Sequence, residues 1–390
     1  MSNSVRVAYL PLVDACILIA AKELGSAADQ GIDLVLERET SWANVRDRIA
    51  IGHVDAAHML APMPIAANLR LTPFDTEVIA PMALGLGGNA ITISQTLRQE
   101  AGFSEAVTAP GEAGATLRRA VANGGERKLR IGVVHRHSAH NLELRYWLAA
   151  SGVDPDRDCE IVILPPPLMP DALAKDQVDA FCVGEPWNSV AVSTGAGAIL
   201  TTKNLIWASS PEKVLGVHSE WARKNDGLLK ALVRSLYGAA KWCSDPANAD
   251  ALQKMLAQPR YLGIDETVVA QALSGPAGYE PFDRAATFPW QSHAMWFYTQ
   301  MVRWGMVEHT APGLDLARRT YRPDLYRDAL REFDAVVPSS SMKVEGALTS
   351  SVPVGAIGGE LVLGPDGFFD GKVFDPDKVE DYLKSQARGA

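Results

Sequence analysis

Hydrophobic and polar positions along the first 60 residues follow two periods. Short, largely apolar runs typical of strands occupy residues 5–10, 33–38 and 54–59. Between them, at about 13–24 and 41–51, apolar residues recur with the period of an amphipathic helix. This region therefore predicts strands that alternate with helices.

The same order returns further along the chain. Strands are predicted at 129–134, 160–164 and 178–183, with helices at 139–150 and 168–176 between them. Strands that alternate with helices of this length indicate α/β units with parallel sheets and right-handed crossovers.

The two units are related by a sequence repeat. Residues 5–7 (VRV) align with 129–131 (LRI), and residues 54–56 (VDA) align with 178–180 (VDA) at the same offset. Two similar α/β units predict two lobes, and ligands of open α/β sheets bind beyond the carboxyl ends of the strands. We therefore expect a ligand in the cleft between the lobes.

The rest of the chain has other patterns. Residues from about 200 to 330 form mainly amphipathic helical patterns, and the segment after Val337 is rich in Gly, Ser and Pro. We expect that final segment to be extended and to wrap around the domain or to be partly mobile.

Composition narrows the function. The chain has 390 residues, 47% of them hydrophobic, and a net charge of -9, which argues against direct binding of nucleic acid. A small anion remains possible, since a local pocket can be positive on an acidic protein. The four cysteines form no CxxC pair, and the sequence has no convincing pair of nucleophile and base that would indicate an enzyme. We therefore expect neither a metal nor a cofactor.

Targeting signals are not recognisable at the N-terminus. Arg6 is the only early base, and Pro11 and Asp14 interrupt the apolar run that a secretory signal needs. No segment reaches about 18 uninterrupted apolar residues, so we expect no membrane partner. These features predict a cytoplasmic protein, unless a leader precedes this sequence.

Five segments resemble the nitrate- and bicarbonate-binding proteins of the NrtA/CmpA type. The segments are SWANVRDRIAIGHVDAAHMLAPMP (41–64), GGNAITIS (87–94), HNLELRYWLAA (140–150), VDAFCVGEPWN (178–188) and PEKVLGV (211–217). The resemblance implies an α/β, two-lobed fold of the type II periplasmic-binding-protein class with its ligand in the interlobe cleft. It implies these divisions: 1–92 for the first part of lobe 1, 93–200 for lobe 2, 201–337 for the helical return to lobe 1, and 338–390 for a C-terminal extended tail.

Within that family the chain is most similar to cytoplasmic nitrate and nitrite sensors of the NasS type, since no leader is recognisable. The similarity implies a sensor that holds an RNA-binding antiterminator, an ANTAR-type protein like NasT, and releases it when the anion binds. Two alternatives stay open: the solute-binding component of a nitrate or bicarbonate ABC transporter and, less favoured, a small-molecule enzyme on the same fold.

Nitrate is a planar monoanion that only accepts hydrogen bonds, so its site needs donors and a positive charge. By resemblance, the ligand-binding residues are Trp42, Asn89, His140, Lys213 and Pro166. The first four have structural alternatives, in the same order: an aromatic packing residue, a turn asparagine, a helix cap and a surface lysine. Pro166 can wall the pocket without offering a competing acceptor side chain.

Three further residues are expected to lie around the ligand-binding set: Met59, Gly88 and Glu185. A carboxylate at position 185 would repel nitrate but could accept from bicarbonate, and it could equally make a structural or interlobe hydrogen bond. His135, His137 and His140 have a spacing that suits a metal, but we expect none, because few carboxylates or thiolates accompany them in the sequence.

Overall fold

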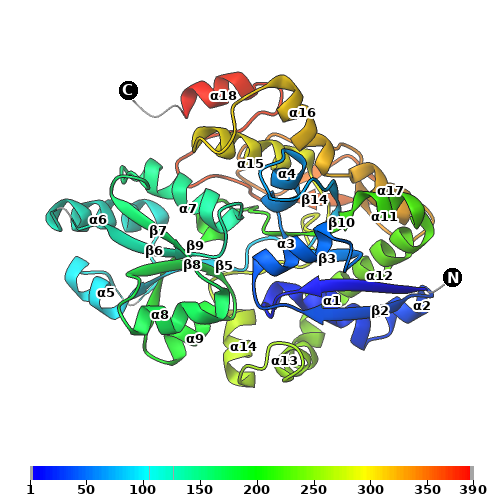
Figure 1. Cartoon of the computed structure of the whole chain (residues 1–390), viewed down its shortest axis with the longest axis horizontal. Coiled ribbons are helices and arrows are strands. Elements are labelled where there is room, and N and C mark those ends of the chain that lie inside the picture. Colours follow the sequence, from blue (N-terminus) through cyan, green and yellow to red (C-terminus); the bar gives the residue numbers. More distant parts are fainter. Residues whose placement is uncertain (1–2, 105, 126, 387–390) are drawn as a thin grey trace.

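The computed structural model describes residues 3–104, 106–125 and 127–386. Two five-stranded sheets with flanking helices form two lobes that lie side by side (Figure 1). The strand order is β2-β1-β3-β10-β4 in lobe 1 and β7-β6-β8-β5-β9 in lobe 2. The predicted α/β, two-lobed architecture is therefore confirmed.

The strands of lobe 1 are β1 (Ser4–Tyr9), β2 (Asp33–Arg38), β3 (Ala56–Leu60), β4 (Val78–Ala83) and β10 (Lys213–His218). Those of lobe 2 are β5 (Asn89–Ser94), β6 (Leu129–Val133), β7 (Cys159–Ile163), β8 (Ala180–Gly184) and β9 (Gly197–Thr202). The prediction of parallel sheets is wrong for one strand in each lobe: β10 runs antiparallel to β3 and β4, and β5 to β8 and β9. Each of these two strands follows a crossing from the other lobe. It therefore starts at the end of its sheet that faces the other lobe, and it runs opposite to its neighbours.

The helices of the first α/β unit are η1 (Val13–Ala15), α1 (Cys16–Glu23), α2 (Ser26–Asp29), α3 (Trp42–Ala50) and α4 (Pro62–Asn68). Lobe 2 contains α5 (Gln95–Ala101), α6 (Pro110–Asn123), α7 (Ala139–Ala150), η2 (Pro166–Leu168), α8 (Met169–Ala174) and α9 (Trp187–Ser193). The return segment forms α10 (Lys203–Ile206), α11 (Ser219–Lys224), α12 (Asp226–Ser244), η3 (Pro246–Asn248), α13 (Ala249–Ala257), α14 (Glu266–Ser274), α15 (Gln291–Arg303), α16 (Ala311–Thr320) and α17 (Pro323–Leu330). None of the described helices is long and apolar enough to cross a membrane.

The sequence repeat corresponds to a repeated hydrogen bond. In lobe 1 the carboxylate of Asp55 accepts from the backbone N–H of Arg6 at 2.8 Å. In lobe 2 the carboxylate of Asp179 accepts from the backbone N–H of Arg130 at 2.8 Å. In both lobes this contact holds the start of the third strand against the first, which confirms that the two units are built alike.

Two helices start at the edge of the sheets where the lobes meet. Ser41 caps α3 by accepting from the N–H of Asn44 at 3.2 Å, as predicted, and Ser138 caps α7 by accepting from the N–H of Asn141 at 3.0 Å. His140 therefore lies in the first turn of α7 rather than at its cap.

Two hinge segments, residues 84–88 and 203–212, connect the lobes and lie against each other. Gly87 N–H donates to the carbonyl of Ser210 at 2.9 Å, and Leu84 N–H donates to the carbonyl of Lys213 at 2.9 Å. The chain thus crosses between the lobes twice at one place, which brings the start of β10 to the interlobe boundary.

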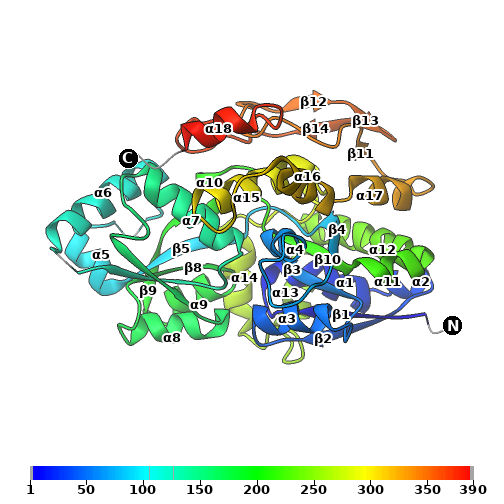
Figure 2. The same cartoon turned by 45° about the horizontal axis from the view of Figure 1, so that its top comes forward.

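The segment after Val337, for which the sequence suggested an extended tail, contains strands β11 (Val337–Pro338), β12 (Val352–Val354), β13 (Ala356–Ile357) and β14 (Leu361–Leu363) and helix α18 (Val379–Ser385). It lies over α15 and α16 (Figure 2). It also reaches lobe 2 and the hinge, because Tyr146 Oη donates to Asp370 at 2.7 Å and Phe369 N–H donates to Ile206 at 2.8 Å.

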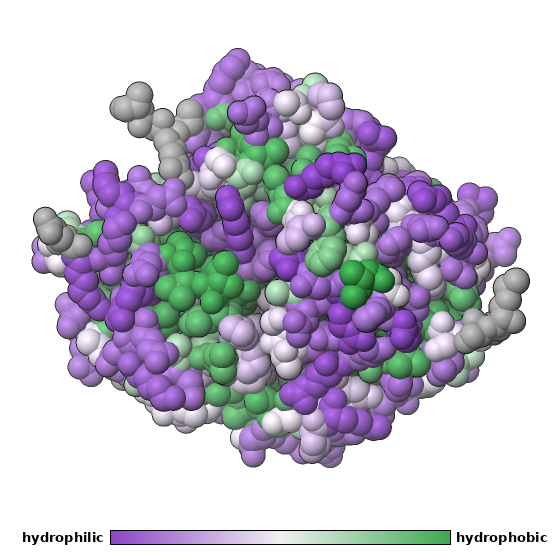
Figure 3. All heavy atoms as spheres, in the orientation of Figure 1, coloured by the Kyte–Doolittle hydropathy of each residue, from purple (hydrophilic) through white to green (hydrophobic). Residues whose placement is uncertain are grey.

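The face seen in Figure 3 is mostly polar, with apolar residues gathered over the part where lobe 2 lies in Figure 1. Lobe 2 carries two strongly exposed aliphatic side chains near the end of β7, Ile163 at 56% and Leu168 at 53% exposure. Lobe 2 therefore presents apolar surface to solvent, a feature that often marks interaction sites.

Candidate functional site

Lys213 is the first residue of β10 and lies where the lobes meet. Its ammonium donates to Asp14 at 2.8 Å and to Glu212 at 3.0 Å, and it lies 5.3 Å from the centre of the Trp42 ring. The side chain is fully buried. A buried ammonium with two carboxylate partners and an aromatic neighbour is held in one position, unlike a solvated surface lysine.

Asp14 lies on the 3₁₀ turn η1 and connects Lys213 to His58 of β3. His58 Nε2 is 3.0 Å from the second carboxylate oxygen of Asp14, and its ring centre is 5.6 Å from that of Trp42. Burial opposes ionisation of Asp14, but Lys213 and His58 outweigh it, so the pKa of Asp14 lies far below its ordinary value. Asp14 is therefore an anion at any physiological pH.

Glu212 joins the two lobes. One of its oxygens lies 3.0 Å from Lys213 Nζ and 3.0 Å from Nδ1 of His140 on α7, and the other contacts the ammonium of Lys203 on α10. Burial raises its pKa, but His140, Lys203 and Lys213 act more strongly together, so the pKa is lowered. Glu212 is thus an ionised junction between lobe 1, the hinge and lobe 2.

Glu143 lies one turn after His140 on α7. Its carboxyl group is 3.0 Å from Lys203 Nζ, and both of its oxygens are 2.8 Å from the hydroxyl of Ser210 in the hinge. Burial raises the pKa of Glu143 to about 7. The ammonium of Lys203 lowers this pKa by less than burial raises it, and Lys203 is shared with Glu212.

We call this set of side chains the interlobe network: Asp14, Trp42, His58, His140, Glu143, Lys203, Ser210, Glu212 and Lys213. Each is at most 2% exposed. Lobe 1, the hinge and lobe 2 all contribute, so the network can form completely only when the two lobes are together.

Some polar atoms of the network have no hydrogen-bond partner among the described residues. They include Nε1 of Trp42 and Nε2 of His140. Burial lowers the pKa of His140 to about 3, so the ring is neutral. Because Nδ1 faces the Glu212 carboxylate, it carries the proton and Nε2 is an acceptor. The indole N–H of Trp42, whose ring centre lies 5.3 Å from the Lys213 ammonium, is a buried donor without a partner among the described residues.

The structure thus brings three of the five predicted ligand residues, Trp42, His140 and Lys213, into one network. Asn89 is the first residue of β5 and is fully buried, but its amide N–H donates to the carbonyl of Gly87 at 2.9 Å. Its oxygen Oδ1 has no partner among the described residues and its amide has a second N–H, so donation from Asn89 to the ligand stays a prediction. Pro166 begins η2 after β7, the outer strand of its sheet, and its contact with a ligand stays a prediction.

The three residues expected around the ligand have structural contacts. Met59 packs against Gly216 of β10, and the carbonyl of Gly88 accepts from the N–H of Glu185 at 2.9 Å. The Glu185 carboxylate accepts from the N–H of Ser189 within lobe 2 at 3.1 Å, which is the structural hydrogen bond weighed above, and the backbone carbonyl of Glu185 accepts from the N–H of Val13 at 2.8 Å. Burial also raises the pKa of the Glu185 carboxyl group to about 7.

Sequence reasoning missed six members of the network: Asp14, His58, Glu143, Lys203, Ser210 and Glu212. A signal did exist for some of them, because Asp14 interrupts an apolar run and Glu143 lies within a largely apolar helix. Charged residues in such positions are rarely buried without partners, so their partners could have been sought.

The three histidines whose spacing suits a metal do not lie together in the structure. The rings of His135 and His137 are 5.7 Å apart, while His140 points to Glu212. Among residues 3–104, 106–125 and 127–386, no group of three or more His, Cys, Asp or Glu side chains is placed to hold a metal ion.

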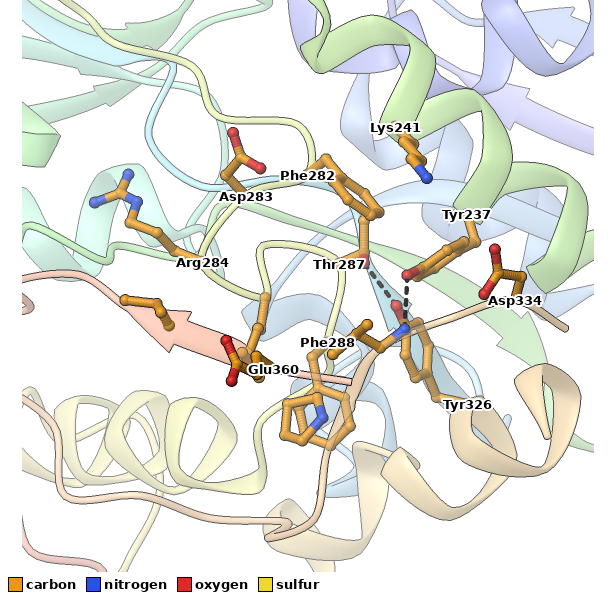
Figure 4. Close-up of a pocket in the computed structure, with 15 residues that line it drawn as sticks. Tyr237, Lys241, Phe282, Asp283, Arg284, Thr287, Phe288, Tyr326, Asp334 and Glu360 are labelled. Atoms are coloured by element: carbon orange, nitrogen blue, oxygen red, sulfur yellow. Dashed lines mark hydrogen bonds between the residues drawn. The ribbon is translucent and has the colours of Figure 1, made fainter. Parts of the chain in front are cut away.

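A cavity of about 600 Å³ lies away from the interlobe network, between α12, α17, the 282–288 segment and the tail (Figure 4). Its aromatic wall is held by the pair of Thr287 and Tyr326, 2.7 Å apart, and by the N–H of Val336 donating to Tyr237 at 3.2 Å. None of the predicted ligand residues lines it.

Comparisons with known proteins identify relatives of the whole chain. The NMT1-like family matches residues 1–257. The nitrate/nitrite binding protein NrtA of Synechococcus elongatus is 30% identical over 404 aligned positions, which cover 98% of this chain and 85% of that protein. The nitrate import ATP-binding protein NrtC of Synechocystis is 34% identical over 83% of this chain, which spans only 49% of NrtC.

The fold matches that of a solved relative. The crystal structure of the periplasmic nitrate-binding protein NrtA from Synechocystis PCC 6803 aligns with a TM-score of 0.85 and 24% identity, covering 99% of both chains. The NrtA relatives are solute-binding proteins, which confirms the expectation of a binding protein rather than an enzyme. The chain belongs to the NMT1-like family and is a homologue of NrtA-type solute-binding proteins with the two-lobed periplasmic-binding-protein fold.

Proposed function

We propose that the protein binds nitrate or nitrite between its lobes, at the interlobe network. The observation that carries this proposal is the fully buried Lys213, whose ammonium lies 5.3 Å from the centre of the Trp42 ring, at a position to which both lobes contribute. The indole N–H of Trp42 has no partner among the described residues. An ammonium and an indole offer only donors, which suits an anion that only accepts. Relatives described as nitrate/nitrite-binding proteins support the same ligand.

Ligand binding at this place couples to closure. His140 belongs to lobe 2, Lys213 and Trp42 belong to lobe 1, and Glu212 links them. A ligand that interacts with both lobes stabilises the closed state over the open one by its differential affinity. The anion would thereby control which surfaces of the protein are presented to a partner.

The proposed setting is the cytoplasm, where the closed and open states control an RNA-binding antiterminator like NasT. The support is the similarity of five segments to the NrtA/CmpA-type family, within which the NasS-type sensors fall, together with the exposed apolar surface of lobe 2. Such surface is suited to a protein partner rather than to nucleic acid, as is the net charge of -9.

The solute-binding component of a nitrate or bicarbonate ABC transporter is the second candidate. It is favoured by the names of two relatives, a periplasmic nitrate-binding protein and a nitrate import ATP-binding protein. Cell fractionation decides between the two settings: the sensor requires the full-length protein in the cytoplasmic fraction, and the transporter component requires it outside that fraction.

Anion titration tests the ligand. Nitrate, nitrite, bicarbonate and sulfate are added in turn while heat and intrinsic tryptophan fluorescence are recorded, with free N-acetyltryptophanamide as the control for direct quenching. We expect saturable binding of nitrate or nitrite and none of sulfate, a dianion. Saturation by bicarbonate alone would refute the assignment of nitrate or nitrite.

A binding experiment with a purified NasT-like protein tests the partner. The two proteins are passed together over a size-exclusion column with and without saturating nitrate. We expect a complex without nitrate and separate proteins with it. A complex that nitrate does not affect, or no complex in either condition, would refute the sensor proposal.

A further inference from the structure

The interlobe network has more buried anions than cations. Three carboxyl groups, those of Asp14, Glu143 and Glu212, share the two ammonium groups of Lys203 and Lys213. With both histidines neutral and all three carboxyl groups ionised, the charge is -1. A nitrate or nitrite ion would bring it to -2 in a site that excludes water, where uncompensated charge is strongly unfavourable.

Glu143 has contacts that suit a protonated carboxyl group. Both of its oxygens lie 2.8 Å from the Ser210 hydroxyl, which has a single proton to donate. With an ionised Glu143, the two contacts share the one hydroxyl proton, so each of them is weaker than a full hydrogen bond. A proton on Glu143 supplies the second donor.

From this geometry we infer that Glu143 takes up a proton when the anion binds, so that the protein binds an anion and a proton together. This inference rests on the proposed function, and it adds a proton-binding residue to the proposed anion site. With Glu143 protonated, the two ammonium groups serve two carboxylates and the network is neutral before the anion is counted.

The other groups that face Glu143 fit this assignment. Lys203 of α10 contacts it directly, and Ser210 and Glu212 of the hinge lie on the same side. His140 precedes Glu143 by one turn on α7, and the charge of Glu143 contributes to the raised pKa of the Cys182 thiol on β8.

Beyond them, the lobe 1 groups already have close partners. Asp14 contacts both Lys213 and His58, so it is the carboxylate least suited to hold the proton. The raised pKa of Glu143, about 7, places its titration in the physiological range.

Proton uptake by Glu143 determines the sign of the pH dependence of anion affinity. A neighbouring anion raises the pKa of Glu143 further, so the bound state holds more protons than the free state above pH 7. By linkage, affinity falls as pH rises, by up to about tenfold per pH unit between the free and the bound pKa values.

Calorimetry measures the proton directly. Nitrate is titrated into the full-length protein at about pH 8.5, where Glu143 is ionised without anion, in two buffers of different ionisation enthalpy. We expect the apparent enthalpy to differ by the uptake of about one proton per anion. Binding with the same enthalpy in both buffers would overturn the inference while leaving the proposed function intact, whereas absence of any binding heat would refute the proposed function itself.

Variants identify the residue. Glu143→Gln imitates the protonated group, so we expect no proton uptake and an affinity that is constant between about pH 7 and pH 9. Glu220→Gln, an exposed site with the same charge change, is the control and should behave as the wild type. Proton uptake that persists in Glu143→Gln but disappears in His140→Asn or Glu185→Gln would assign the proton to another group and overturn the inference.

Discussion

At the scale of single residues, the site depends on buried groups whose partners come from distant parts of the chain. Lys213 is held by Asp14 and Glu212, while the indole N–H of Trp42 has no partner in the part of the chain that the structure describes. Satisfied and unsatisfied donors thus lie side by side. The satisfied ones hold the network together, and in the proposed site the unsatisfied one is available to the ligand.

Replacing Lys213 by Ala tests the role of a donor that already has protein partners. The change leaves buried Asp14 without an ammonium and Glu212 with that of Lys203 alone, so we expect nitrate affinity to fall at least about tenfold and the free energy of unfolding to fall by roughly 3–5 kcal/mol. Calorimetry measures the affinity, and urea denaturation measures the stability. Unchanged affinity in a folded variant would remove Lys213 from the site.

Replacing Trp42 by Phe tests the role of the donor that has no partner among the described residues. The aromatic packing is kept and an unpartnered N–H is removed, so stability should stay the same or rise slightly. Loss of one hydrogen bond to an anion should raise the Kd for nitrate by roughly tenfold or more. A thermal unfolding curve and a nitrate titration on the same sample check both halves. A Kd equal to that of the wild type would show that the indole does not contact the ligand.

At the scale of elements, the crossing segments determine where β5 and β10 begin. Residues 84–88 lie against residues 203–212 and the 277–280 turn, which leaves little room for side chains. Gly87 has a φ of +69°, and a Cβ there would lie 2.4 Å from the carbonyl oxygen of Gly278. Close backbone packing therefore holds the network residues of the hinge in place.

We accordingly expect Gly87→Ala to lower the free energy of unfolding by at least about 1–3 kcal/mol, since an alanine there has both an unfavourable φ and a steric clash. The matched control is Gly238→Ala in α12, where no atom lies within 4 Å of the added Cβ and the helix should gain up to about 1 kcal/mol. Urea denaturation of both variants provides the comparison. Equal stability of the two would contradict the steric argument.

At the scale of the whole molecule, the C-terminal segment joins the return helices, the hinge and lobe 2. A second buried ion cluster anchors it: Glu345 contacts Lys343 and accepts from Ser292 of α15 at 2.6 Å, and Lys343 also contacts Asp366 at 2.8 Å. Burial opposes ionisation of Glu345, but Lys343 and His293 outweigh it and lower its pKa to about 2.

The lowered pKa gives a signed prediction. Ionised Glu345 stabilises the fold above its ordinary pKa of about 4.5, and this stabilisation is lost as pH falls from there towards 2. We expect Glu345→Gln to lower the free energy of unfolding by roughly 1–3 kcal/mol at pH 6, with a difference from the wild type that shrinks below pH 4.5. Urea denaturation at several pH values measures it. The exposed Glu380→Gln is the control, and a difference independent of pH would contradict the ionic role.

The sequence alone determined the local structure and the two-lobed plan. Hydrophobic periodicity, the Ser41 cap and the repeated VDA motif depend on residues close together in the chain, which is why they could be recognised without coordinates. Similarity to a family then pointed to Trp42, His140 and Lys213, and the structure places all three in one network.

Only the tertiary structure decided which charges meet. Asp14 and Glu143 lie far in the sequence from each other and from Lys203 and Glu212, which are themselves nine residues apart, and no local pattern pairs these four. The direction of β5 and β10 also depends on the two crossings between lobes, and the turn before β5 brings the amide of Asn89 to the carbonyl of Gly87. Periodicity reports which face of an element is buried, whereas ion pairs and strand directions depend on how distant elements pack, and that is where the chemistry of this site is set.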